Sequence, residues 1–143
     1  MKTQLLALSA IVGSVLAAPA VADDYVIDTE GQHAFIQFKI KHLGYSWLLG
    51  RFNDFEGKFS YDESNPGNAS VEVTIDTASV DTNHAERDKH LRSDDFLNTG
   101  EYPEASFVST RYVPDSDDEN EGTLYGNFTL NGVTKEIAIE VEQ

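Results

Sequence analysis

Hydrophobic side chains recur at every second position along much of this chain. Between His33 and His42, apolar residues alternate with polar ones, so that one face is apolar and the other carries lysines. A period of two is the spacing of a β-strand with one buried face. The apolar face of this segment comprises Ala34, Ile36, Phe38 and Ile40, and it ends at His42. The alternation therefore predicts a half-buried strand in a sheet with one apolar side.

Further segments repeat the pattern between turns. Residues 47–61 are strand-like, but the apolar phase changes between Phe52 and Phe55, which predicts a bulge or bend there. Asn131-Gly132 is a strong hairpin signal. Other strands are expected over residues 71–75, 103–114, 122–130 and 133–141, the first of them after a turn at 64–68. About seven strands with short turns imply an all-β, antiparallel sheet that closes, or nearly closes, into a barrel.

One short helical insertion interrupts the strands. Asn83 followed by Glu86 is an N-cap and capping-box pair, so we expect a helix from His84 to about Arg92. On this helix Leu91 is the expected core anchor. If Leu91 faces the core, the neighbouring side chains on the helix lie toward the rim of the barrel.

The helical segment also concentrates positive charge in an acidic chain. Arg87 and His90 could hydrogen-bond a phosphate or another polar head group, because a guanidinium can bind such groups with two parallel hydrogen bonds. The alternative is a structural network in which Arg87 and Arg92 bond nearby acids or loop carbonyls. We favour the network, because arginine beside acids is usually a structural or solvated pair.

The N-terminus has the features of a cleavable signal peptide over residues 1–22. Lys2 precedes an apolar run from Leu5 to Ala18, and Ala20-Val21-Ala22 is a small-x-small cleavage signal. The run is shorter than the roughly 18 apolar residues that a membrane span needs. We therefore expect an exported protein that does not span the membrane, with residues 23–143 forming one domain.

Charge and cysteine content exclude several classes of protein. The chain has 25 acidic and 10 basic side chains and a formal net charge of −15, and such a surface repels nucleic acid and anionic head groups. It contains no cysteine, so the core must hold the fold without disulfides. No glycine-rich phosphate loop, dinucleotide fingerprint or haem motif occurs, and no cofactor is expected.

Three apparent chemical motifs have simpler explanations. His84 and Asp88 have the spacing of two metal ligands, but two ligands do not make a site. Ser93, His90 and Asp94 have the residue types of a hydrolytic triad without a nucleophile elbow. The acidic run 115–121 lacks the glycine and glutamate positions of a calcium loop, and we expect a solvated hairpin loop.

Several motifs together resemble the YceI-like polyisoprenoid-binding family. The most specific is the segment Arg87-Asp88-x-His90-Leu91-Arg92-Ser93-x-Asp95-Phe96. The others are His42-Leu43-Gly44, Gly50-Arg51-Phe52-x-x-Phe55-x-Gly57-x-Phe59, Ser79-Val80-Asp81-Thr82-Asn83, Tyr102-Pro103 with Phe107, and Leu130-Asn131-Gly132-Val133-Thr134-Lys135. The resemblance covers essentially the whole chain after the signal peptide.

The resemblance implies a lipocalin-like antiparallel barrel of eight strands that holds a long isoprenoid or fatty-acid-like lipid in an apolar tunnel. It implies a periplasmic protein that is not an enzyme. Family members continue past the hairpin at Asn131-Gly132 into a last closing strand, which we expect to be missing here. The oligomeric state is left open, a homodimer included.

The first hypothesis is thus a non-enzymatic protein that binds, transports or stores such a lipid. The lipid tail is expected against Ile36, Phe38, Ile40, Val73, Phe107, Phe128 and Ile137, and the polar head at a rim formed by His42, Arg87 and His90. A second hypothesis is a hydrolase or isomerase of an amphipathic isoprenoid-type substrate, with His90 as general acid or base. A third is a stress-related interaction protein with a filled core. An apolar pattern does not distinguish a packed interior from a tunnel.

Overall fold

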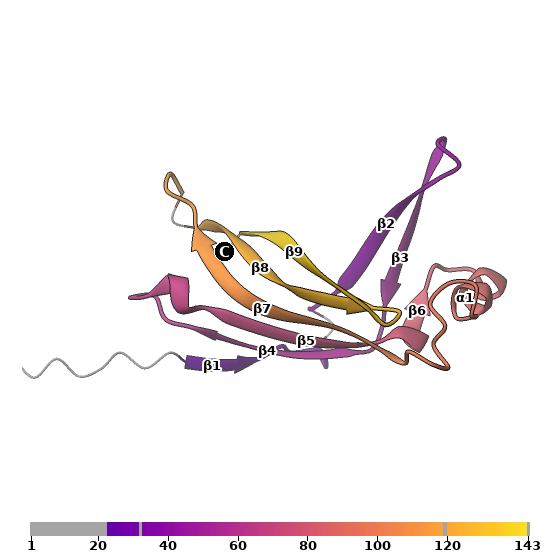
Figure 1. Ribbon diagram of the computed structural model, residues 1–143, viewed down its shortest axis with the longest axis horizontal. Coiled ribbons are helices and arrows are strands. Elements are labelled where there is room, and N and C mark those ends of the chain that lie inside the picture. The colour runs from indigo at the N-terminus through magenta and orange to yellow at the C-terminus, as the bar shows by residue number, and fades with distance from the viewer. Residues whose placement is uncertain (1–22, 32, 119, 143) are drawn as a thin grey trace, which may run out of the picture.

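The computed structural model describes residues 23–31, 33–118 and 120–142 (Figure 1). The expected signal peptide, residues 1–22, lies outside the described residues, and the division into a signal peptide and one domain stays a prediction. No helix in the described part of the chain is long and apolar enough to cross a membrane.

The described chain is an all-β, antiparallel structure with one α-helix. Its strands are β1 (Asp23–Val26), β2 (Ile36–His42), β3 (Ser46–Phe52), β4 (Phe55–Tyr61), β5 (Ser70–Asp76), β6 (Val80–Asp81), β7 (Glu104–Pro114), β8 (Glu121–Leu130) and β9 (Val133–Glu142). The helix is α1 (Ala85–Leu91), and two short 3-10 helices are η1 (Pro66–Asn68) and η2 (Thr77–Ser79). The expected fold class is confirmed.

The strands form two sheets. The large sheet has the order β1-β4-β5-β7-β8-β9, and the small sheet has the order β2-β3-β6. Figure 1 shows the large sheet curling so that β9 rises above β4 and β5, while the β2–β3 hairpin rises separately beyond it. The helix α1 follows β6 at the same end of the molecule as this hairpin.

The described residues contain nine strands, more than the seven expected. The segment 47–61 divides into β3 and β4 at the phase change between Phe52 and Phe55, as the sequence predicts. The two additions are β1, with four residues, and β6, with two. Strands this short do not show a period of two, so their pairing with β4 and β3 is decided by the partner strands.

The helix also begins later than expected. His84, not Asn83, is the N-cap, and its Nδ1 accepts a hydrogen bond from the backbone N–H of Arg87 at 3.3 Å. Asn83 has a φ of 63°, and its N–H donates to Asp81 Oδ1 at 2.8 Å. Its left-handed backbone therefore belongs to the turn before the helix. The capping-box interpretation of Asn83 and Glu86 was wrong by one residue.

One face of the large sheet, which we call the inner face, carries the core. Phe107, Tyr112 and Leu124 are buried there. Phe107 and Tyr112 are an odd number of positions apart on β7, and they share this face because the register shifts at a bulge between Ser109 and Arg111. Ala69, Val71, Phe128, Ile137 and Val141 pack around the three buried residues.

Close packing on the inner face requires glycine at position 126. A Cβ atom added to Gly126 would lie 2.4 Å from the Phe107 ring and 2.7 Å from the Val108 carbonyl oxygen. The ring could tilt, but the carbonyl is part of the β7–β8 ladder. We therefore expect Gly126→Ala to lower the free energy of unfolding by about 1–3 kcal/mol in urea titrations.

The matched control for this prediction is Gly67→Ala in η1. A Cβ atom there meets nothing within 4 Å. Equal stability of the Gly126→Ala and Gly67→Ala proteins would contradict the packing described for the inner face.

Candidate functional site: the inner face and its rim

An apolar row crosses the inner face from strand to strand. Val73 on β5 pairs with Phe107 on β7, and Phe107 pairs with Phe128 on β8. Ile137 on β9 pairs with Gly126, one step further along the same face. Directly paired residues lie on the same side of a sheet. The structure thus brings these four expected tunnel residues together.

The other three expected tunnel residues lie on the small sheet. Ile36, Phe38 and Ile40 pair with Phe52, Gly50 and Leu48, so these six residues form one face of the β2–β3 hairpin. The rings of Phe38 and Phe52 are 5.6 Å apart, and a Cβ atom on Gly50 would overlap the Phe38 ring at 2.2 Å. Ile40 is 52% exposed. This apolar face is therefore open to solvent at Ile40 and only partly covered elsewhere.

A mostly apolar hollow of about 290 Å³ lies at the inner face, toward the end of the sheet that carries η1. It is lined by Phe59, Ser60, Tyr61, Ala69, Val71, Tyr112, Leu124 and Val141. Phe59 and Ile139, which are both on this face, remain 37% and 39% exposed. Ligand pockets for small molecules are usually of this size or larger and are lined mainly by apolar groups. Apolar surface therefore remains exposed along the inner face at and beside this hollow.

Several lining residues were not among the expected site residues. Val71 and Val141 follow the alternation of their strands, so the alternation could have predicted both as lining residues. Tyr112 could not be assigned from its strand, because the bulge before it changes the face on which it lies. A bulge has no obligatory sequence signature at this position, where the extra residue is Thr110.

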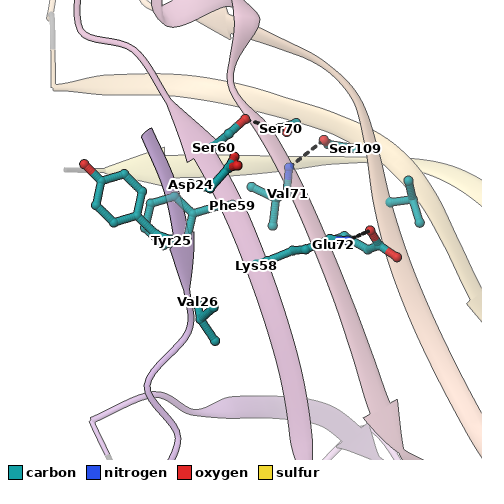
Figure 2. A pocket seen from close by; sticks show the side chains of 11 residues that line it. Asp24, Tyr25, Val26, Lys58, Phe59, Ser60, Ser70, Val71, Glu72 and Ser109 are labelled. Atoms are coloured by element: carbon teal, nitrogen blue, oxygen red, sulfur yellow. Dashed lines mark hydrogen bonds and ion pairs between the residues drawn. The ribbon is translucent and has the colours of Figure 1, made fainter. Parts of the chain in front are cut away.

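A second hollow, of about 360 Å³, has a different chemical character (Figure 2). Lys58 Nζ and Glu72 Oε2 form an ion pair at 3.0 Å across it, and Ser60 and Ser70 are joined by a hydrogen bond of 2.8 Å. Ser109 Oγ accepts from the backbone N–H of Val71 at 2.8 Å, beside the bulge in β7. These polar pairs stand among apolar lining residues, whereas the hollow at the inner face is lined almost wholly by apolar surface and is therefore the better candidate site.

The rim contains a buried carboxylate that the sequence did not reveal. Asp88 on α1 is 8% exposed and accepts hydrogen bonds from the backbone N–H of Thr82, at 2.9 Å, and from the Thr82 hydroxyl. Its position on the helix gave no signal, because acidic side chains are seldom buried. Through this residue the helix is fastened to the end of β6.

Arg87 belongs to the same network. Its Nε donates to Thr82 Oγ1 at 2.7 Å and its Nη2 donates to the Thr82 carbonyl at 2.6 Å. Arg92 Nη1 donates to the Val80 carbonyl at a longer 3.4 Å. Both arginines therefore donate to backbone carbonyls of the chain that leads into the helix. This is the arrangement that the structural-network alternative predicts.

The two rim histidines lie on separate elements. His90 Nε2 is 3.6 Å from Asp95 Oδ2, and its ring meets Phe96 edge-on at 4.8 Å between centroids. His42 ends β2, pairs with Ser46 and is exposed. Figure 1 shows the tip of the β2–β3 hairpin set apart from α1. The structure thus does not gather His42, Arg87 and His90 into one cluster.

Asp81 ends β6 and bonds to residues of β3 and of the two loops beside it. Its carboxylate accepts from Asn53 Nδ2 and Arg51 Nη2, each at 3.3 Å, and from the backbone N–H of Asn83. The Asn83 N–H, then the Asn53 amide and to a smaller extent Arg51, hold the pKa of Asp81 below its usual range. In the described residues, no group of three or more His, Cys, Asp or Glu side chains is arranged to hold a metal.

Solved structures with a similar fold define the class of protein. BcnA of Burkholderia cenocepacia superposes with a TM-score of 0.73 at 22% identity, over 81% of this chain and 70% of that one. The YCEI protein of Campylobacter jejuni gives a TM-score of 0.63 at 34% identity, over 79% of this chain and 65% of that one. The fold is that of a lipocalin-like antiparallel β-barrel protein.

Sequence comparison identifies the family. A family model described as the YceI-like domain matches residues 25–143. Protein YceI of Escherichia coli O17:K52:H18 is 57% identical over 142 residues, which are 99% of this chain and 73% of that protein. A UPF0312 protein of Pseudomonas paraeruginosa is 58% identical over 144 residues, with the same coverage. The chain belongs to the YceI-like family. A missing closing strand is not supported by these matches and stays a prediction.

Replacing Arg87 should weaken the fold, because its two hydrogen bonds hold the approach to α1. We expect Arg87→Ala to lower the free energy of unfolding by about 1–2 kcal/mol, with a smaller loss for Lys89→Ala on the exposed surface of the same helix. Urea unfolding followed by circular dichroism measures both. An unchanged stability of Arg87→Ala, together with lost ligand binding, would instead assign Arg87 to the ligand.

Asp81 should make stability depend on pH in the acid range. Its pKa is lower in the folded than in the unfolded chain, so its contribution is present above the unfolded pKa and is lost as pH falls through the folded pKa, below about pH 4. Asp81→Asn should therefore be less stable than the parent protein at neutral pH, and the difference should shrink on acidification. Thermal unfolding across this pH range tests the prediction. A difference that does not vary with pH would contradict it.

Proposed function

We propose that the chain binds a long-chain lipid along the inner face, with a polyisoprenoid as the first candidate. The observation that carries this proposal is the apolar hollow of about 290 Å³ on that face. Family membership supports the same ligand class, since the resemblance to YceI-like proteins implies a polyisoprenoid. Apolar contact is sufficient to hold such a chain, because each buried methylene contributes about 0.8 kcal/mol.

In this proposal the lipid tail follows the row from Val73 through Phe107 to Phe128 and Ile137. The apolar face of the β2–β3 hairpin, with Ile36, Phe38 and Ile40, contacts the tail from another side. Of the three rim residues, His42 and His90 are available to a polar head group, whereas the Arg87 guanidinium is already bonded to Thr82.

We further propose that the protein is periplasmic and transports or stores its lipid without chemical change. An enzyme that uses His90 needs a second polar group aimed at the same substrate. The acid nearest to His90 in the described contacts is Asp95, at 3.6 Å, and both side chains are largely exposed. This arrangement does not favour the hydrolase or isomerase.

The filled-core interaction protein has one observation in its favour. Phe107, Tyr112 and Leu124 are 6%, 7% and 6% exposed, so the centre of the inner face is packed. In that case the inner face would hold no lipid. A binding experiment with a polyprenol distinguishes the lipid-binding protein from the filled-core interaction protein.

Native mass spectrometry of the protein mixed with a long-chain polyprenol tests the proposal. The protein should retain the polyprenol, and Phe59→Ser and Ile139→Ser should weaken retention by roughly tenfold each, because each removes exposed apolar surface from the inner face, in the hollow at Phe59 and beside it at Ile139. Val108→Ser is the matched control, since Val108 is 46% exposed on the opposite face of the same sheet. Absence of any polyprenol adduct, or equal retention by all variants, would overturn the proposal in favour of a filled core.

A further inference from the structure

The β2–β3 hairpin has a charge opposite to that of the rest of the chain. Residues 31–53 contain Lys39, Lys41 and Arg51 and not one aspartate or glutamate, whereas the whole chain carries 25 acidic side chains and a net charge of −15. Arg51 forms an ion pair with Asp81 at 3.3 Å between Nη2 and Oδ2. Lys39 and Lys41 have no ion pair with any acid in the described part of the chain.

These two lysines share a face with exposed hydrophobic side chains. In the hairpin register, Lys39 pairs with Leu49 and Lys41 pairs with Trp47, so all four lie opposite the apolar face that carries Phe38. Trp47 is 57% exposed and Leu49 is 67% exposed. Lys39 Nζ lies 4.5 Å from the centroid of the Trp47 ring. We call this surface the outer face of the hairpin.

The tip of the hairpin extends the same surface. Leu43 is 77% exposed and Tyr45 is 94% exposed, on either side of Gly44. Figure 1 shows this tip standing clear of the large sheet and of α1. Two aromatic and two aliphatic side chains are therefore presented to solvent on this projecting hairpin, beside two lysines that form no ion pair within the described residues. Exposed apolar groups gathered in this way usually mark an interaction surface.

The chemistry of the outer face fits an anionic lipid surface. Tryptophan and tyrosine favour the head-group level of a bilayer, and lysine stems lie along apolar surface while their charges reach toward phosphates. The same phosphates repel the acidic remainder of the molecule. Attraction at the hairpin and repulsion elsewhere would orient the protein with the tip toward the membrane. We propose that the β2–β3 hairpin docks the protein on a membrane surface that carries anionic phospholipid head groups.

Docking is separate from the binding of a lipid at the inner face. It uses the outer face and the tip of the hairpin, and it requires no lipid inside the protein. Failure of one proposal therefore leaves the other standing. If both hold, docking places the protein at a membrane from which a lipid can be taken up or to which it can be released.

Trp47 is the single tryptophan of the chain, so its fluorescence reports on the hairpin alone. The full chain is titrated with vesicles of phosphatidylglycerol mixed with phosphatidylcholine, and separately with vesicles of phosphatidylcholine. We expect a blue shift and protection from acrylamide only with the anionic vesicles. Raising the salt concentration should reverse both, since salt screens exposed charges.

Charge reversal locates the interaction on the hairpin. Lys39→Glu/Lys41→Glu should weaken vesicle binding by at least about tenfold, given about 1 kcal/mol for each lysine near an anionic surface. Lys89→Glu/Lys135→Glu makes the same change in net charge on α1 and β9 and should bind nearly as the parent does. Leu43→Ser/Tyr45→Ser retains Trp47 and both lysines and should reduce the blue shift. Circular dichroism verifies that each variant is folded, and each shift is measured from that variant's own vesicle-free spectrum.

Three results would overturn the proposal. The first is no spectral change with anionic vesicles, which would leave the outer face to a protein partner. The second is an equal change with phosphatidylcholine alone. The third is an equal loss of binding in the hairpin pair and in the control pair of lysine variants.

Discussion

The arrangement of both sheets depends on one corner, where the apolar phase of the chain changes between Phe52 and Phe55. Ser79 holds this corner: its hydroxyl accepts from the Asp54 N–H at 3.0 Å and donates to the Asp76 carbonyl at 2.6 Å. The Asp54 carbonyl in turn accepts from the Asp76 N–H at 2.9 Å. Two neighbouring strands thus bend at the same level, β3 into β4 and β5 into β6. The bend turns the β2–β3 hairpin away from the large sheet.

The sequence predicts the parts of this structure that depend on local chemistry. Alternation correctly placed Val73, Phe107 and Phe128 on one face, and the phase change correctly placed the bend after Phe52. Asn131-Gly132 forms the expected turn, with φ values of 49° and 72°. These features follow from the two-residue period and from the φ values that turns demand.

Other features depend on partners distant in the sequence. β1 has four residues, and it forms a strand because β4 offers a free edge, with Tyr25 stacked on Phe59 at 4.8 Å between rings. Asp88 is buried because Thr82 gives it two donors, a pairing that helical spacing does not reveal. The rim residues His42 and His90 belong to two separate family motifs and lie on elements that the fold sets apart (Figure 1).

The net charge of the whole chain and the local charge of the hairpin predict opposite interactions with an anionic membrane. A net charge of −15 predicts repulsion from anionic head groups, and this holds for most of the surface. The acid-free hairpin is a local exception that an average over the chain conceals. The two proposals therefore use opposite faces of one hairpin: the apolar face toward a bound lipid, and the basic, aromatic face toward a bilayer.

The central claim is that a lipid chain lies on the inner face of the large sheet. Methyl NMR of valine- and isoleucine-labelled protein, titrated with a polyprenol, tests it most directly. The account predicts that shifts follow the strand alternation and concentrate on the inner-face methyl groups of Val71, Val73, Ile137, Ile139 and Val141. The methyl groups of Val26, Val108 and Val113 on the outer side of the sheet should remain unchanged. Perturbation of this second set, with the first unaffected, would contradict the account.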